Sequence, residues 1–136
     1  MRYIVVFDMN ILLSALFSNT GNPFRCLALA KIGQVESVTC QAILDEFAEK
    51  LLVKFKFSEE KMQESVAEVR SFSSLVEISG NPKIVTADPD DNMVVECAIV
   101  SNATHIVTGD KHLLMLGSHQ DINIVKTTEF IDLLSL

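Results

Sequence analysis

The chain has 136 residues, of which 49% are hydrophobic and 21% are charged, a balance that is typical of globular proteins and excludes an intrinsically disordered one. This length predicts one domain, residues 1–136, able to bury about two-thirds of its unfolded surface. The formal net charge of -7 excludes a general electrostatic attraction to nucleic acid. Binding of RNA or DNA would therefore need a local basic patch, a metal ion or a partner of opposite charge.

The sequence also predicts a cytoplasmic protein without a membrane span. The apolar run before Asp8 is too short for a signal peptide or a transmembrane helix. The three cysteines (Cys26, Cys40 and Cys97) lie far apart in apolar surroundings and form no C-x-x-C pair, so we expect buried structural thiols and no zinc site. Their odd number suits a reducing compartment.

The first half of the chain alternates between strand and helix patterns. "YIVVF" (3–7) is apolar throughout and rich in β-branched and aromatic residues, as in a strand covered on both faces. The elements expected after it are a helix over 11–17, a helix from Pro23 to Gly33, a strand over 35–39, a helix over 41–55 and a helix capped by Ser58.

The second half repeats this alternation. The expected elements are a strand over 74–78, an irregular loop over 79–91, a largely buried helix from Asp90 or Asp91, a strand in 104–110 that ends in an aspartate, a strand over 122–126 and a closing helix capped by Thr127 or Thr128. Strands that alternate with helices predict an α/β sandwich around a mainly parallel sheet.

Two aspartates follow the predicted strands "YIVVF" and "HIVTG". In open parallel sheets, ligands bind beyond the carboxyl ends of the strands, which is where Asp8 and Asp110 lie. Neighbouring carboxylates repel unless a proton or a cation offsets their charge, and Mg²⁺ and Mn²⁺ prefer oxygen ligands. Each aspartate also precedes a helix, so helix capping explains either one alone.

Further acids lie in two helical segments. In "QAILDEFAEKL", Glu46 flanks the apolar stripe, whereas Asp45 and Glu49 occupy a more solvent-facing side. In "DPDDNMVVECA", three aspartates crowd a helix start, and capping accounts for only one of them.

Together, "VVFDMNILLSALF", "VTCQAILDEFAEKL", "DPDDNMVVECAIVSNATHIVTGDKHLL" and "INIVKTTEFIDLL" resemble the PIN domain family, over the full chain and in the family's order. The similarity is strongest to the PIN proteins that serve as toxin components of bacterial and archaeal toxin–antitoxin systems. It implies a three-layer α/β/α sandwich with a mainly parallel central sheet and an acidic cleft.

The resemblance also implies which residues form the site. The four acids of the family fall on Asp8, Glu46, Asp91 and Asp110, with Asp90 as a close competitor for the third position and Asp88 as a weaker one. The polar residues that accompany the first and last acids fall on Asn10 and Thr108. Two departures are Met9, where the family often has Thr, and His112, where relatives often carry another acid.

The implied function is that of an endoribonuclease that uses Mg²⁺ or Mn²⁺ to hydrolyse RNA phosphodiester bonds. We expect Asp8, Asp91 and Asp110 to hold the metal, Glu46 to bind metal or orient the attacking water, and products with 5′-phosphate and 3′-hydroxyl ends. Lys54 and Lys111 are candidates for contacts with the RNA backbone.

The resemblance further implies a cognate antitoxin as partner and a homodimer. The apolar helices after Pro23 or Ser58 are candidates for the dimer surface, and equally for the core.

One other class remains as an alternative, and the sequence argues against two more. A PIN-like RNA-binding or scaffold protein with weak or degenerate nuclease activity is the non-enzyme alternative, which Met9 keeps open. A phosphatase with a strand-end aspartate as nucleophile usually has a second aspartate two residues on, where this chain has Asn10. A receiver domain usually pairs adjacent acids after its first strand, which this chain does not.

Overall fold

The computed structural model describes residues 2–79 and 88–135. In this part of the chain, strands with the order β3-β2-β1-β4-β6-β5 form one six-stranded sheet. The strands are β1 (Ile4–Phe7), β2 (Glu36–Cys40), β3 (Ser73–Val76), β4 (His105–Val107), β5 (Ser118–His119) and β6 (Ile122–Val125). All neighbours pair in parallel except β5 and β6, so the predicted mainly parallel sheet is confirmed.

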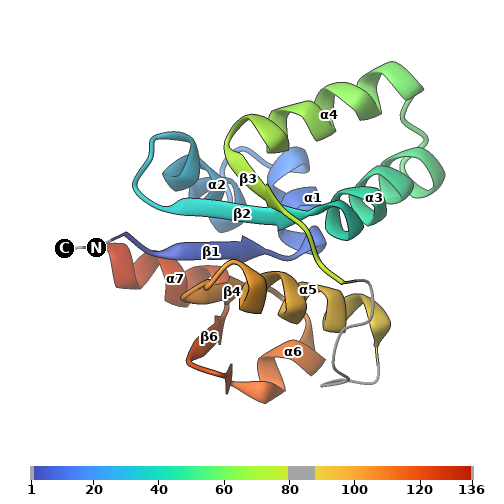
Figure 1. Cartoon of the computed structure of the whole chain (residues 1–136). Helices are drawn as coiled ribbons and strands as arrows, with labels where there is room; N and C mark the ends of the chain where they lie inside the picture. The colour runs from blue at the N-terminus through green and yellow to red at the C-terminus, as the bar shows by residue number, and fades with distance from the viewer. Residues whose placement is uncertain (1, 80–87, 136) are drawn as a thin grey trace.

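Helices cover both faces of this sheet and form the outer layers of an α/β/α sandwich. They are α1 (Met9–Phe17), α2 (Asn22–Lys31), α3 (Gln41–Glu49), α4 (Glu59–Ser71), α5 (Pro89–Val100), α6 (Lys111–Leu116) and α7 (Thr127–Leu134), with a π-helix, η1 (Lys50–Lys54), directly after α3. On one face α5 packs on β1, β2 and β4, whereas α1, α2, α3 and α7 contact one another on the other (Figure 1).

The central strands are buried because their side chains are apolar on both faces. The largest fully buried side chains come from the sheet and from helices of both layers: Phe7, Phe47, Phe130, Leu44, Leu51, Ile106 and Leu113. The three cysteines are free and buried, as predicted. The apolar side chains of α2 and α4 (Cys26, Leu27, Ala30 and Val69) also face the core, which is the second of the two roles expected for these helices.

Several element boundaries differ from the predictions. Helix α1 begins at Met9 and α5 at Pro89, one or two residues early, because Asp8 and Asp88 accept hydrogen bonds as N-caps. The predicted 41–55 helix changes to π geometry at Lys50. The cap of α7 is Lys126, and neither of the two predicted threonines caps it. Most of the loop predicted over 79–91 lies outside the described residues.

Two further differences concern the sheet. Strand β4 ends at Val107, so that Asp110 follows it only after two intervening residues instead of directly. The short edge strand β5 was not predicted, because two residues are too few to show a period. Strand β3 begins at Ser73 and ends at Val76.

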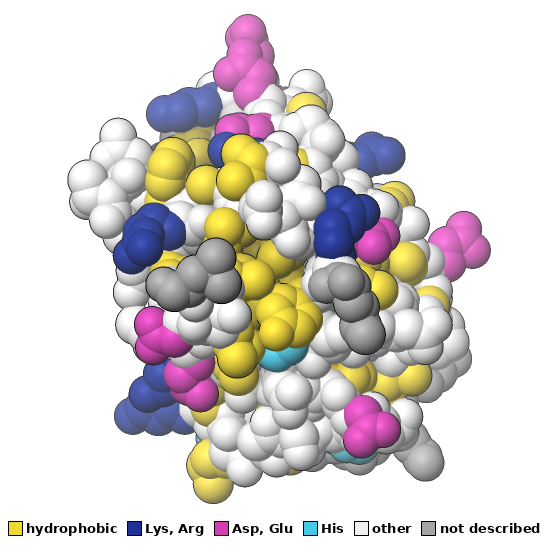
Figure 2. All heavy atoms as spheres, turned by 90° about the vertical axis from the view of Figure 1, so that its left-hand side faces the viewer, with side chains coloured by type: hydrophobic (Ala, Val, Ile, Leu, Met, Phe, Trp, Pro, Cys, Tyr) yellow, Lys and Arg dark blue, Asp and Glu magenta, His cyan; other side chains and the backbone are white. Residues whose placement is uncertain are grey.

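The face at the amino ends of the strands is apolar at its centre. Below this surface, the buried rings of His105 and Phe130 pack with Tyr3, with centroids 4.9 Å apart for Tyr3 and His105 and 5.6 Å for His105 and Phe130. Figure 2 shows this face, with apolar side chains around a histidine and charged side chains of both signs toward the rim. In the described residues, no helix is both long and apolar enough to cross a membrane.

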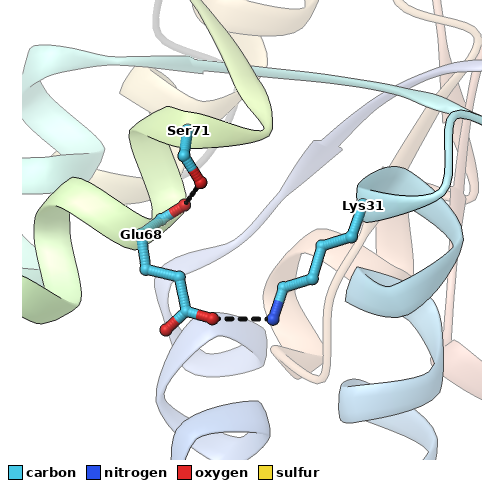
Figure 3. A network of polar contacts seen from close by, with 3 residues as sticks. All are labelled: Lys31, Glu68 and Ser71. Carbon is cyan, nitrogen blue, oxygen red and sulfur yellow. Dashed lines mark hydrogen bonds and ion pairs between the residues drawn. The ribbon is translucent and has the colours of Figure 1, made fainter.

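An apolar cleft of about 210 Å³ lies between α1, α2, α3 and α4. Its apolar lining includes Leu12, Leu27, Phe47, Val69 and Phe72. At its border an ion pair joins α2 to α4, with Lys31 Nζ 2.8 Å from Glu68 Oε1, and the Ser71 hydroxyl donates to the Glu68 carbonyl (Figure 3).

Candidate active site

The first and last acidic residues of the predicted site are brought together by strand pairing. Strands β1 and β4 are parallel neighbours, and Phe7 pairs with Val107 at their carboxyl ends. The backbone N–H of Asp8 extends this ladder by donating to the Val107 carbonyl at 3.0 Å. Asp8 and Thr108 therefore leave the sheet side by side, although 100 residues separate them in the sequence.

Both oxygens of the Asp8 carboxylate have a partner. Oδ1 accepts from the Met9 backbone N–H at 2.7 Å, which caps α1, and Oδ2 accepts from the Thr108 hydroxyl at 2.7 Å. The side chain is 6% exposed, and this burial raises its pKa, with smaller contributions from Asp110 and Asp88, against the lowering effect of the two hydrogen bonds. Asp8 is thus both a helix cap and a buried, incompletely compensated charge.

Thr108 also connects Asp8 to Asp110. Its buried hydroxyl accepts from the Asp110 backbone N–H at 3.0 Å while it donates to Asp8. The Asp110 carboxylate caps α6 by accepting from the backbone N–H groups of His112 and Leu113 at 2.7 and 3.2 Å. A single hydroxyl therefore binds the carboxylate of Asp8 and the backbone of Asp110.

The three aspartates at the start of α5 differ in position. Asp88 is exposed and caps α5 by accepting from the Asp90 backbone N–H at 2.9 Å. Asp90 is also exposed, whereas Asp91 is 4% exposed. Oδ2 of Asp91 is buried without a hydrogen-bond partner among the described residues. Burial, together with the charges of Asp110, Asp88 and Asp8, raises the pKa of Asp91 to about 7, against the opposing effect of His112.

Glu46 reaches the same region from α3. It is half-buried, and burial raises its pKa to about 7, together with the charges of Asp90 and Asp8 and a hydrogen bond between the carboxyl groups of Glu46 and Asp90. Lys50, one helical turn further on, acts in the opposite direction. Asp45 and Glu49 are exposed, as their helix positions predicted.

The acids that follow β1, lie on α3 and α5 and precede α6 thus act on one another at one edge of the sheet. Outside residues 1, 80–87 and 136, no group of three or more acidic, His or Cys side chains is close enough to hold a metal ion as arranged. The chemistry of the donors nevertheless fits Mg²⁺ or Mn²⁺, because all are carboxylate oxygens. Oδ2 of Asp91, which has no hydrogen-bond partner among the described residues, fits a metal ligand best, since a bound cation would compensate its buried negative charge.

The remaining predicted residues are less closely connected to the site. Asn10 lies on the exposed side of α1, and its side chain forms no hydrogen bond in the described part of the chain. His112 is exposed, but its charge acts to lower the pKa of Asp91. The Met9 side chain is buried in the core. Residue 9 donates to Asp8 through its backbone N–H, so this hydrogen bond does not depend on which side chain is present. The hydroxyl that binds Asp8 comes instead from Thr108.

Lys50 is the site residue that sequence reasoning missed. Its positive charge partly opposes the rise in the pKa of Glu46, so the structure places it beside the cluster. Its position four residues after Glu46, on the same side of a helix, was the signal available in the sequence.

Comparison with known proteins identifies the fold and the family. A sequence model of the PIN domain matches residues 4–112. An uncharacterized protein of Methanocaldococcus jannaschii is 32% identical over 116 residues, which cover 82% of this chain and 74% of that protein.

Two solved structures resemble this one. The structure of VapBC2 from Rickettsia felis, bound to a DNA fragment from its promoter, superimposes with a TM-score of 0.62 at 15% identity, covering 90% of this chain and 98% of that one. The PIN domain of T. brucei RRP44 gives a TM-score of 0.54 at 12% identity, covering 97% of this chain and 80% of that one. The fold, the order of its motifs and the matched sequence model agree, and the chain belongs to the PIN domain family.

Proposed function

We propose that this protein is an endoribonuclease that hydrolyses RNA phosphodiester bonds with the help of Mg²⁺ or Mn²⁺. PIN domains are generally nucleases that use divalent metal ions, which supports the reaction class. The observation that carries the proposal is the uncompensated carboxylate cluster, in which Asp91 and Glu46 have their pKa raised to about 7 while Oδ2 of Asp91 lacks a partner among the described residues. Such a cluster is expected where a cation binds.

Each acid has a distinct task in this proposal. Asp8 and Asp91 would hold the ion, because they are the two most buried carboxylates of the cluster and their charges act on each other. Asp110 would complete the set, positioned by the hydrogen bond that its backbone N–H donates to Thr108. When bound, a divalent cation supplies an activated water, neutralises charge on the phosphate and helps the leaving oxygen.

Glu46 is the candidate for proton transfer. A carboxyl group with a pKa of about 7 exchanges a proton readily near neutral pH, which suits a general base that takes the proton of the attacking water. Attack by water in line with the 3′ oxygen leaves a 5′-phosphate and a 3′-hydroxyl.

The test is cleavage of a structured RNA by purified protein with Mn²⁺ or Mg²⁺, comparing wild type with Asp8→Asn, Glu46→Gln and Glu49→Gln. We expect Glu46→Gln to lose at least about a hundredfold in rate, as is typical when a proton-transfer group is removed. Asp8→Asn should lose at least as much, because it removes a carboxylate that would hold the cation. Glu49→Gln is the matched control, because Glu49 lies on the same helix but is exposed. Its rate should equal that of wild type, and the product ends should carry 5′-phosphate.

Asp8→Asn, together with a further variant, Asp110→Asn, tests whether the cleavage comes from a contaminating nuclease. If Asp8→Asn and Asp110→Asn cleave RNA as fast as wild type, a contaminating nuclease is responsible and the proposal is wrong. If no preparation cleaves RNA but wild type binds it, the protein is the RNA-binding or scaffold alternative.

We further propose a biological role as the toxin of a cytoplasmic toxin–antitoxin pair, supported by the structural resemblance to a VapBC complex. The cleft between α1, α2, α3 and α4 has an apolar lining that fits apolar side chains of a partner segment. The net charge of -7 favours a basic partner. Expression of the chain alone should arrest growth, coexpression of an antitoxin encoded by a neighbouring gene should restore it, and light scattering would test for the proposed homodimer.

A further inference from the structure

The basic residues of this acidic protein are concentrated in one segment. Of its 11 lysines and arginines, four lie in residues 50–61, in the sequence "KLLVKFKFSEEK". They are Lys50, Lys54, Lys56 and Lys61, and all are exposed. Within residues 2–79 and 88–135, none of the four lies within ion-pair distance of a carboxylate. Their ammonium groups are therefore available to an anionic ligand.

Aromatic rings lie among these lysines. Phe17, at the end of α1, and Phe55, at the end of η1, pack with their ring centroids 4.6 Å apart, and Phe57 lies 5.9 Å from Phe17. Phe17 is 51% exposed and Phe55 37%, although both are large and apolar. Lys54 Nζ lies 5.5 Å from the centre of the Phe55 ring, and Lys61 Nζ 4.4 Å from that of Phe57. We call Phe17, Phe55, Phe57, these two lysines and Lys56, which lies between Phe55 and Phe57 in the sequence, the aromatic platform.

Two neighbouring helices connect the aromatic platform to the acidic cluster. Helix α1 starts directly after Asp8 and ends at Phe17, about 13 Å away at 1.5 Å per residue. Helix α3 carries Glu46 and continues through η1 to the platform, and it packs against α1. Lys50 lies between the two ends, where its charge acts on Glu46. An anionic polymer that runs from the acidic cluster to the platform would therefore pass Lys50 before it reaches the lysines of the platform.

We propose that the aromatic platform binds single-stranded RNA beside the scissile phosphate, with bases stacked on Phe17 and Phe55 and phosphates paired with Lys50, Lys54 and Lys56. The choice of ligand rests on the proposed ribonuclease function. Exposed rings next to unpaired cations match the two features that single strands offer, a π-face on each base and a charge on each phosphate. At about 3.4 Å per stacked nucleotide, the distance to Asp8 corresponds to roughly four nucleotides.

The platform also explains how a chain with a net charge of -7 accepts RNA. The acidic cluster repels phosphate unless a cation is bound, so affinity has to come from elsewhere on the surface. Stacking tolerates any base sequence, because every base has a π-face. The platform therefore contributes affinity and a preference for unpaired RNA, without reading the bases.

The experiment measures binding of a fluorescently labelled single-stranded oligoribonucleotide of about ten nucleotides by anisotropy, in EDTA so that no cleavage occurs. The double variant Phe17→Leu/Phe55→Leu keeps the apolar surface and removes the rings. We expect its Kd to rise about tenfold or more. A duplex of the same sequence should bind wild type more weakly, since paired bases cannot stack on the protein.

The lysines are tested through salt dependence. Lys54→Gln/Lys56→Gln should reduce the slope of log K against log salt by roughly 0.7 for each phosphate that the protein no longer neutralises. The control Arg25→Gln/Lys126→Gln makes the same change in net charge at exposed positions outside the platform and should leave the slope unchanged. Ile32→Ala is the control for removal of an exposed apolar side chain, because Ile32 is 69% exposed and lies outside the platform.

Unfolding of each variant is measured by circular dichroism, so that RNA affinities are compared only among folded proteins. Unchanged RNA affinity in folded Phe17→Leu/Phe55→Leu overturns the proposal. Dissociation of a dimer in this variant, with RNA affinity unchanged, would show instead that the surface joins two protein chains.

Cleavage kinetics separate this proposal from the proposed function. With Mn²⁺, the platform variants should raise KM and leave kcat unchanged, whereas Asp8→Asn should abolish kcat. If wild type cleaves RNA and the platform variants bind it normally, the platform proposal is wrong and the nuclease proposal stands. If the platform binds RNA but Asp8→Asn changes no cleavage, the nuclease proposal fails and the platform proposal stands.

Discussion

At the scale of single residues, Thr108 controls the geometry of the acidic cluster. Its hydroxyl donates to Asp8 and accepts from the backbone of Asp110, and the side chain is completely buried. A buried hydroxyl with both partners in place orients the groups that it contacts. Hydrogen-bonding partners of this kind hold metal-binding carboxylates in a fixed direction.

Replacing Thr108 with Val should therefore weaken both stability and metal binding. The change keeps the shape but leaves an Asp8 oxygen and the Asp110 N–H without a partner, which costs about 1–3 kcal/mol of unfolding free energy. The Kd for Mn²⁺, measured by calorimetry, should rise about 10- to 100-fold.

Thr104→Val is the matched control. Thr104 makes comparable hydrogen bonds at the opposite end of β4, where it donates to the Ile4 carbonyl and accepts from the Ile4 N–H. It should lose stability, since its hydroxyl also contacts His105 Nδ1 at 2.8 Å, but no metal affinity. Equal Mn²⁺ affinity in Thr108→Val and wild type would contradict a role for Thr108 in the site.

At the scale of elements, helix starts and candidate ligands coincide. Asp8 caps α1, Asp88 caps α5 and Asp110 caps α6. The N-terminal ends of these helices carry partial positive charge, which favours carboxylates nearby. Capping and metal binding are therefore compatible roles of the same side chain. The sequence left both roles open for Asp8 and Asp110, and each residue can have both.

Substitutions at Asp110 separate the two roles. Asparagine caps helices about as well as aspartate, whereas alanine does not, and losing the cap costs about 1 kcal/mol. We expect Asp110→Asn to melt no lower than wild type and to lose RNA cleavage, and Asp110→Ala to melt at a lower temperature than Asp110→Asn and to lose cleavage as well. Wild-type cleavage by Asp110→Asn would show that Asp110 is only a cap.

At the scale of the whole molecule, the acidic cluster stores unfavourable electrostatic energy. The pKa of Asp91 and of Glu46 is about 7 in the folded protein, against about 4 in an unfolded chain. Between these values the folded state binds more protons than the unfolded state, so the free energy of unfolding falls as the pH rises. This decrease is complete above about pH 7 and absent below about pH 4.

The metal-free protein should accordingly melt at a higher temperature near about pH 5.5 than near about pH 8, by several degrees in calorimetry with EDTA. Saturating Mn²⁺ should raise the melting temperature more at the higher pH, because the ion binds the deprotonated carboxylates. Asp91→Asn should flatten the pH dependence and raise the metal-free melting temperature at the higher pH. A melting temperature that rises with pH in EDTA would contradict the raised pKa of these acids.

Much of the fold could be predicted from local patterns. The strand before Asp8, the helix that starts at Gln41 and the alternation of strands and helices follow from apolar runs and their periods, which tertiary contacts did not override. Boundaries were less predictable, since a cap such as Asp88 competes with equally good neighbours. The edge strand β5 depends on pairing with β6, which no local pattern encodes.

The sequence by itself determined the family and the mainly parallel sheet and predicted the acids of the candidate site, because residue order and hydrophobic period are properties of the chain. Only the tertiary structure decided which of the three crowded aspartates is buried, since the turn of α5 against the sheet directs Asp91 inward. The contact of Thr108 with Asp8 and the pairing of Phe17 with Phe55 likewise join distant segments. Such contacts exist only after β1 meets β4 and α1 meets α3.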